Sequence, residues 1–199
     1  MNKKVLRVSV FALLAGLFSL AGCESLHRIK STHPEELGKA PVQAVKIKVA
    51  ANKTAAPLFI IERNKNANIV RYDANLAPDG NLAPAEPVVA YWLLLAGDGS
   101  RKKLNWLEKK KAYGIRVKPG PGKDAFTLTL AAAPWLPLTV KKTGDSARAE
   151  TSINGRPAVL EKMFIQARDR LIGPKVEYVE LYGNDLQTGE PCREKIIPK

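Results

Sequence analysis

Apolar and polar residues alternate along much of the chain after residue 43, and this pattern limits its fold more than any other feature. Val45, Ile47 and Val49 alternate with lysines, and residues 126–130 and 136–140 show the same period of two. This period turns one face of a strand inward and the other toward solvent. Further strands are predicted at 58–63, 68–73, 88–95, 113–118, 147–153, 158–166 and 175–182.

Turn-forming pairs separate these segments. A glycine stands next to an aspartate at residues 98–99 and 144–145 and next to a proline at 173–174. Asn154-Gly155 lies directly between two predicted strands. The Asn-Gly pair predicts a hairpin with a type I′ turn, because both of its positions need positive φ. Many short strands joined by such turns predict an all-β domain, an antiparallel meander that is barrel-like or a sandwich.

One short helix is predicted near residues 105–112. Asn105 can cap its first turn, while the Glu108 side chain reaches back to the Asn105 amide. Gly114 follows the last predicted turn, where helices often end on a glycine. The helix would be two turns long at most.

The first 22 residues predict a lipoprotein signal peptide whose helix is removed. A basic start precedes an uncharged run at 8–20, which is too short to span a bilayer but fits a secretory segment. Leu20-Ala21-Gly22-Cys23 resembles a lipobox, in which small residues admit a peptidase and the Cys23 thiol takes a diacylglycerol. The alternative is an ordinary signal peptide with a chance cysteine, since ordinary cleavage sites also use small residues.

Three segments follow from this assignment: a signal peptide at 1–22, a flexible tether at 23–43 from lipidated Cys23, and a single β-rich domain at 44–199. Glu24, in place of an aspartate, favours the outer membrane facing the periplasm over the inner membrane. If Cys23 carries lipid, Cys192 is the only other cysteine and an internal disulfide is excluded.

The chain is strongly basic, with 32 Lys and Arg against 19 Asp and Glu and a formal net charge of +13. Such a charge suits an anionic envelope surface or an envelope protein, besides the membrane that the lipid anchor would enter. The alternative is that the charge only keeps the protein in solution. Nucleic acid is not an expected partner, because the chain is exported and lacks recognition-helix and zinc-finger patterns.

Several chemistries are excluded from the predicted domain. Both histidines, His27 and His33, fall in the tether, so the domain cannot form a Ser-His-Asp triad, a Cys-His pair or a His-ligated zinc site. No phosphate loop is present, and the EF-hand template fails because Pro78 would take its glycine position. No cofactor and no metal are therefore predicted, whereas paired-carboxylate catalysis stays open.

Three polar clusters are candidates for ligand binding. They close the strand at 58–63, cover the predicted helix and run from residue 180 to residue 185. One interpretation places them around one mouth of a barrel as a polar pocket, and the other assigns them to tight turns and surface ion pairs. Together with Asp73, the candidates are Glu62, Arg63, Asn64, Lys65, Asn66, Glu108, Tyr113, Glu180, Tyr182 and Asp185.

The same clusters carry a resemblance to a known family. The segments LFIIERNKNANIVRYDANL at 58–76, PVVAYW at 87–92, LN through EKK at 104–110 with AYG at 112–114, and EYVELYG at 177–183 with TGE at 188–190 resemble the bacterial domain-of-unknown-function family 4833. The resemblance spans residues 56–197, and Asn64 stands where the family commonly has serine. It implies a β-rich exported domain and carries no activity and no catalytic residues.

Together these features favour a lipid-anchored cell-envelope protein that binds a ligand or a partner without catalysis. One alternative is a periplasmic enzyme that uses carboxylates or tyrosines without histidine or metal. The other is a structural component of the envelope.

Overall fold

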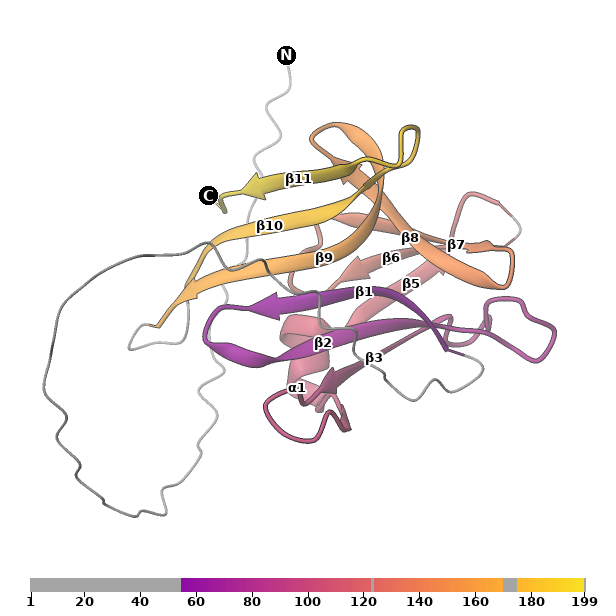
Figure 1. Ribbon diagram of the computed structural model, residues 1–199. Helices are drawn as coiled ribbons and strands as arrows, with labels where there is room; N and C mark the ends of the chain where they lie inside the picture. Colours follow the sequence, from indigo (N-terminus) through magenta and orange to yellow (C-terminus); the bar gives the residue numbers. More distant parts are fainter. Residues whose placement is uncertain (1–54, 123, 170–174, 199) are drawn as a thin grey trace, which may run out of the picture. The chain divides into compact units, whose positions relative to one another are not determined.

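The computed structural model describes residues 55–122, 124–169 and 175–198 (Figure 1). These residues form eleven strands and one short helical segment. The strands are β1 (Ala55–Arg63), β2 (Asn66–Asn75), β3 (Val88–Leu93), β4 (Arg101–Lys103), β5 (Ile115–Pro119), β6 (Ala125–Leu130), β7 (Pro137–Thr143), β8 (Ser146–Ile153), β9 (Arg156–Arg168), β10 (Lys175–Asp185) and β11 (Pro191–Ile196).

The strands form one curled sheet that resembles a half-barrel. Its strand order is β4-β3-β2-β1-β9-β8-β7-β6-β5, and β10 and β11 continue from β9. Every pair of neighbours is antiparallel except β1 and β9, which are parallel. The all-β, barrel-like prediction is confirmed, with the difference that two meanders, β1–β4 and β5–β9, join through this parallel pair.

Strand β9, the last strand of the second meander, also pairs with the first meander. Residues 156–159 pair with β8 and residues 162–165 pair with β1, whereas β10 pairs along nearly the whole of β9. Because β10 occupies one edge throughout, β8 and β1 share the other edge, and the sheet divides there into two layers (Figure 1).

The hydrophobic core lies between these two layers. Alternate residues of the first meander and of the second meander turn inward to form it, including Val70 and Tyr72 from β2 and Leu138 and Val140 from β7, all fully buried. Phe59 stacks on Tyr72 with ring centroids 4.4 Å apart. Each large apolar side chain buried in this way contributes about 1.5–3 kcal/mol, so the core and not a disulfide holds the layers together.

The short helix is confirmed, and it connects the strands at the two ends of the sheet path. It comprises α1 (Trp106–Glu108) and a wider turn, η1 (Lys109–Tyr113), between β4 and β5. The capping box is present: the Glu108 amide donates to Asn105 Oδ1, and the Asn105 amide donates to Glu108 Oε2, both at 2.8 Å. In the described part of the chain no helix is both long and apolar enough to cross a membrane.

Gly114 follows the helix as predicted, but its conformation is extended (φ −67°, ψ 156°) and not left-handed. The reason for the glycine is close approach, because a Cβ atom at this position would lie 1.9 Å from the Lys109 carbonyl oxygen. The chain can therefore turn back over the end of η1 only where no side chain intervenes.

Most other predicted elements are present at slightly different bounds. Asn154 (φ 51°) and Gly155 (φ 75°) confirm the type I′ turn between β8 and β9. Strand β3 ends at Leu93, two residues earlier than the prediction, and β4 and β11 were not predicted. The predicted signal peptide, Cys23, the predicted tether and the predicted strand at 45–49 lie outside the described residues.

Candidate functional site

The strands β1, β9, β10 and β11 present one polar face, which we call the outer sheet face. Their alternate residues Ile61, Met163 and Leu181 are buried in the core, so the residues between them point the opposite way. The strand register aligns them in rows across the strands. The face comprises Ile60, Glu62, Lys162, Phe164, Gln166, Tyr178, Glu180, Tyr182, Arg193 and Lys195.

A continuous polar network crosses this face from β1 to β11. Glu62 Oε2 lies 3.3 Å from Lys162 Nζ, which lies 4.7 Å from the centre of the Tyr182 ring. The Tyr182 hydroxyl donates to Glu180 Oε2 at 2.6 Å, and Arg193 forms an ion pair with the same carboxylate. Three of the candidates, Glu62, Glu180 and Tyr182, are thus brought together.

Glu180 is the most enclosed charge of the network, with only 7% of its side chain exposed. The hydrogen bond from Tyr182 and then the Arg193 guanidinium lower the pKa of Glu180 below its ordinary value, whereas burial works against them. The same hydrogen bond raises the pKa of Tyr182. At neutral pH the carboxylate is therefore charged and the phenol is neutral, which makes Glu180 an acceptor that fixes its neighbours.

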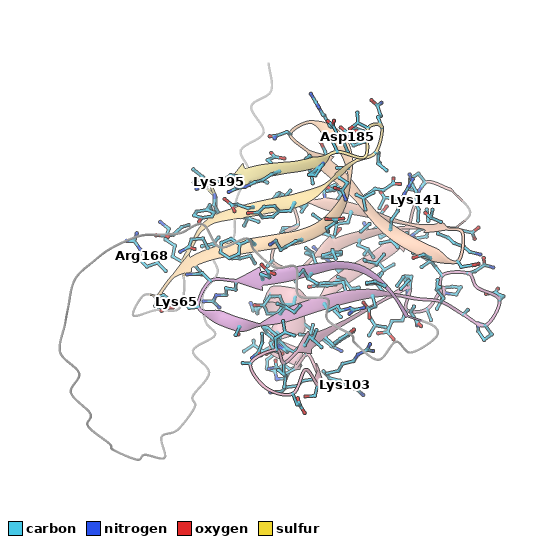
Figure 2. The ribbon with its side chains drawn as sticks, in the orientation of Figure 1. Lys65, Lys103, Lys141, Arg168, Asp185 and Lys195 are labelled. Carbon is cyan, nitrogen blue, oxygen red and sulfur yellow. The ribbon has the colours of Figure 1, made fainter. Side chains whose placement is uncertain are left out.

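Beside this network, a second group combines aromatic rings with cations. Lys195 Nζ lies 3.7 Å from the centre of the Tyr178 ring, and Tyr178 and Phe164 are in tilted contact at 6.4 Å. A hollow of about 260 Å³ lies at the end of β9 and β10, beyond the last residues of β11. Figure 2 shows Lys195 and Arg168 at this end of the three strands. The hollow is lined by Arg168, Lys175, Val176, Glu177, Ile197 and Pro198.

Arg63, Glu108 and Tyr113 lie at a different place, where η1 packs against the first meander. The Tyr72 hydroxyl donates to the Tyr113 carbonyl oxygen at 2.7 Å, and the Trp92 ring meets the Tyr113 ring edge-on at 5.1 Å. Burial raises the pKa of Tyr113, while the Arg63 side chain beside it acts in the opposite direction. This group fastens the helical segment to the sheet.

Asp73 forms a third group on β2 and β3. It is 1% exposed, and it accepts hydrogen bonds from Arg71 Nε and from the Tyr91 hydroxyl, both at 2.6 Å. Burial and then this hydrogen bond raise the pKa of Tyr91 to about 12. The arrangement gives each oxygen of this buried carboxylate one hydrogen-bond donor.

The remaining candidates serve turns, as the alternative interpretation of the polar clusters has it. Asn64 extends the β1–β9 pairing, because its side chain both donates to and accepts from the Ala167 backbone at 2.8 Å. Lys65 takes the left-handed position (φ 61°) of the β1–β2 turn, and Asn66 Oδ1 accepts from the Asn68 amide. Asp185 accepts from the Gln187 and Thr188 amides, which lower its pKa.

Sequence reasoning did not find several members of the outer sheet face: Lys162, Phe164, Tyr178, Arg193 and Lys195. Their alternate spacing along β9 and β10 was available as a signal, but Arg193 and Lys195 stand on β11, which was not predicted. Within residues 55–122, 124–169 and 175–198, no three His, Cys, Asp or Glu side chains converge as metal ligands. Cys192 is partly enclosed, and burial raises the pKa of its thiol.

Comparison with known proteins identifies a family and adds no activity. No curated protein and no solved structure matches the chain. The model of one family, described as a domain of unknown function, matches residues 59–195, which include the described strands from β2 to β10. Because this match covers more than half of the chain, the protein belongs to the domain-of-unknown-function family DUF4833.

Proposed function

We propose that this protein is a lipid-anchored component of the cell envelope that binds an acidic saccharide on its outer sheet face without catalysing a reaction. The observation that best supports this proposal is that cations of β9 and β11 lie against the tyrosine rings of β10. Flat rings offer an apolar surface to sugar rings, and fixed cations offer partners to carboxylate or phosphate groups.

The charges of this face leave a positive surplus. Five cations stand on it or line its hollow, against the three carboxylates Glu62, Glu177 and Glu180. Ion pairs with these carboxylates fix three of the cations, so less side-chain entropy is lost when a ligand binds. The five cations are Lys162, Arg168, Lys175, Arg193 and Lys195.

A carboxylate enzyme is less well supported by the same geometry. It would need Glu62, Glu108 and Glu180 in one concave site with raised pKa values. Glu108 instead completes the capping box of α1, and the pKa of Glu180 is lowered. The tyrosines Tyr91, Tyr113 and Tyr182 have raised pKa values, which makes them weaker acids at neutral pH.

Calorimetric titration tests the binding proposal. The protein is titrated with oligosaccharides that carry carboxylates or phosphates and with neutral glucan oligomers of the same length. Acidic oligomers are expected to bind and neutral ones to bind at least about tenfold more weakly, because two or more charge-assisted hydrogen bonds are lost. Tyr178→Ala combined with Lys195→Gln should weaken binding by a similar factor.

The matched control is Lys141→Gln, which removes one positive charge from β7 in the second meander and should leave the affinity unchanged. Absence of binding by every acidic oligomer, or equal weakening by the control, contradicts the saccharide proposal. In that case a structural role in the envelope becomes the better hypothesis.

The anchor is tested separately at Cys23. Several acyl chains on one residue would hold the protein stably in a bilayer, and we propose the outer membrane, facing the periplasm, as its place. Cys23→Ala should abolish metabolic labelling with a radioactive fatty acid, whereas Cys192→Ala should leave labelling unchanged. Continued labelling of the Cys23→Ala protein would show that this residue is not the anchor.

A further inference from the structure

Strands β4 and β5, together with the connection between them, carry the densest positive charge of the described residues. Residues 101–118 contain eight Lys and Arg against one carboxylate, Glu108, and all eight cations are exposed. Glu108 is itself engaged with the Asn105 amide. The eight are Arg101, Lys102, Lys103, Lys109, Lys110, Lys111, Arg116 and Lys118, and we call this region the basic turn.

A large apolar side chain stands in the middle of the basic turn. Trp106 is 72% exposed, the most exposed of the large hydrophobic residues that the structure describes. It precedes Lys109 and Lys110 by three and four residues, so the indole and the two ammonium groups stand on the same short helical segment. A tryptophan beside lysines is the combination that proteins place at the interface between a bilayer and water.

The basic turn also contains a hollow of about 350 Å³ between η1, β5 and the end of β6. Three cations, Lys109, Lys110 and Arg116, line it, and none of them forms an ion pair with a residue in the described ranges. The other lining residues are Gly114, Ile115 and Ala131, so no carboxylate faces this space. The hollow is therefore suited to an anionic group such as a phosphate.

The base of the basic turn is held rigidly. The Ala131 amide donates to the Gly114 carbonyl oxygen at 2.8 Å, and the Tyr72 hydroxyl donates to the Tyr113 carbonyl oxygen at 2.7 Å. Figure 2 shows Lys103 of this region well apart from Lys195 and Arg168, so the basic turn and the outer sheet face are separate surfaces. These hydrogen bonds fix the backbone of the basic turn relative to the sheet.

We propose that the basic turn docks the domain onto an anionic lipid bilayer, with Trp106 in the interfacial region and a lipid phosphate in the hollow between Lys109, Lys110 and Arg116. The surplus of seven positive charges supplies the long-range attraction, and the indole supplies the apolar contact. This surface is independent of the saccharide site and of the lipid on Cys23.

Vesicle binding tests this proposal with a chain that begins at Glu24 and so lacks the signal peptide and the anchor cysteine. Every residue of the hydrophobic cluster within the described part of the chain lies after Ala55, so this chain keeps all of them, and circular dichroism verifies its fold. It should partition into phosphatidylglycerol vesicles at least about tenfold more strongly than into phosphatidylcholine vesicles, and the preference should fall with added salt.

Variants locate the contact. Lys109→Gln with Lys110→Gln should lower partition into phosphatidylglycerol about 25-fold, because each cation near an anionic surface contributes about fivefold. The matched control, Lys65→Gln with Lys175→Gln, removes the same charge from the β1–β2 turn and from the first residue of β10, and should change partition much less. Trp106→Ala should reduce partition about tenfold through loss of apolar contact.

Fluorescence supplies the second readout. Lipids with brominated acyl chains should quench the tryptophan fluorescence of the protein without these substitutions on phosphatidylglycerol vesicles. This quenching should disappear in Trp106→Phe. Equal partition into neutral and anionic vesicles, an equal effect of the control pair, or unchanged quenching in Trp106→Phe would overturn the proposal. None of these results depends on saccharide binding or on acylation, so the two proposals can fail separately.

Discussion

Two carboxylates, Asp73 and Glu180, are almost fully enclosed, and each is held by one arginine and one tyrosine. Arg71 and Tyr91 bind Asp73, and Arg193 and Tyr182 bind Glu180. A buried charge is costly unless it is paired and hydrogen-bonded, and these two meet both conditions. At the scale of single residues, therefore, carboxylates that could be taken for catalytic groups in the sequence instead form buried ion pairs and hydrogen bonds within the fold.

Glu180→Gln should remove a pH-dependent part of the stability. Tyr182 and Arg193 lower the pKa of Glu180 below the ordinary 4.5, so folding favours the charged form. A lowered pKa adds stability that is complete above pH 4.5 and is lost as the pH falls through the lowered value. Thermal midpoints of wild type and variant should differ at about pH 7 and converge toward about pH 3.

The control for this experiment is Glu190→Gln, which removes an exposed carboxylate beyond the end of β10. Its midpoint should stay close to that of the wild type at both pH values. A gap between Glu180→Gln and wild type that persists unchanged at about pH 3 would show that ionisation of Glu180 does not carry the effect.

The candidate site was predictable from the sequence only in part. Glu180 and Tyr182 stand in a polar cluster on a predicted strand, and Glu62 ends another, so their types and positions were visible. Their assembly was not, because Glu62 reaches the network through the parallel pairing of β1 with β9. The partner Arg193 lies on β11, whose residues show no clear apolar period.

At the scale of elements, nine of the eleven described strands follow from alternation and turn chemistry. The exceptions, β4 and β11, are strands at the ends of the pairing pattern and have a single partner each. All three residues of β4 are exposed cations, and β11 contains a proline and three charged residues. Their extended conformation comes from hydrogen bonds to β3 and β10, which local sequence cannot reveal.

The pairing of β9 with β10 depends on a glycine at a register shift. A Cβ atom on Gly183 would lie 2.1 Å from the Val159 carbonyl oxygen. Gly183→Ala should therefore force the two strands apart and lower the free energy of unfolding by about 1–3 kcal/mol, measured by chemical denaturation.

Gly97→Ala is the matched control, because a Cβ atom there meets nothing closer than 3.7 Å and Gly97 has no positive φ. This variant should be neutral or slightly stabilising. Equal stability of the two alanine variants would contradict the close approach at Gly183.

At the scale of the whole described domain, β9 makes the two meanders one structural unit. Their inward residues enter one hydrophobic cluster, and neither layer can bury its apolar face without the other. The sequence predicted the meanders but not their union, because a parallel pairing between the first and ninth strands leaves no local pattern.

A substitution in the core of one meander should consequently lower the unfolding midpoint of the other meander as well. Leu138→Ala in β7 is expected to lower stability by about 2–5 kcal/mol, since Leu138 is fully buried. In a background where Trp106 and Trp135 are Phe, fluorescence of Trp92 reports on the first meander. The unfolding midpoint measured by Trp92 fluorescence should shift as much as the midpoint measured by circular dichroism. Separate transitions for the two probes would show that the layers unfold independently. The control, Val117→Ala on the exposed β5, should shift neither midpoint.

The parallel pair has a consequence for the order in which the molecule can assemble. Asn64 at the end of β1 meets Ala167 at the end of β9, 103 residues later in the chain. Because β1 can complete its pairing only after β9 has been made, β1–β4 alone would present an open strand edge and an uncovered apolar face. Such an edge invites pairing with other chains. The first half of this domain would therefore be prone to aggregation until the rest of the chain is completed.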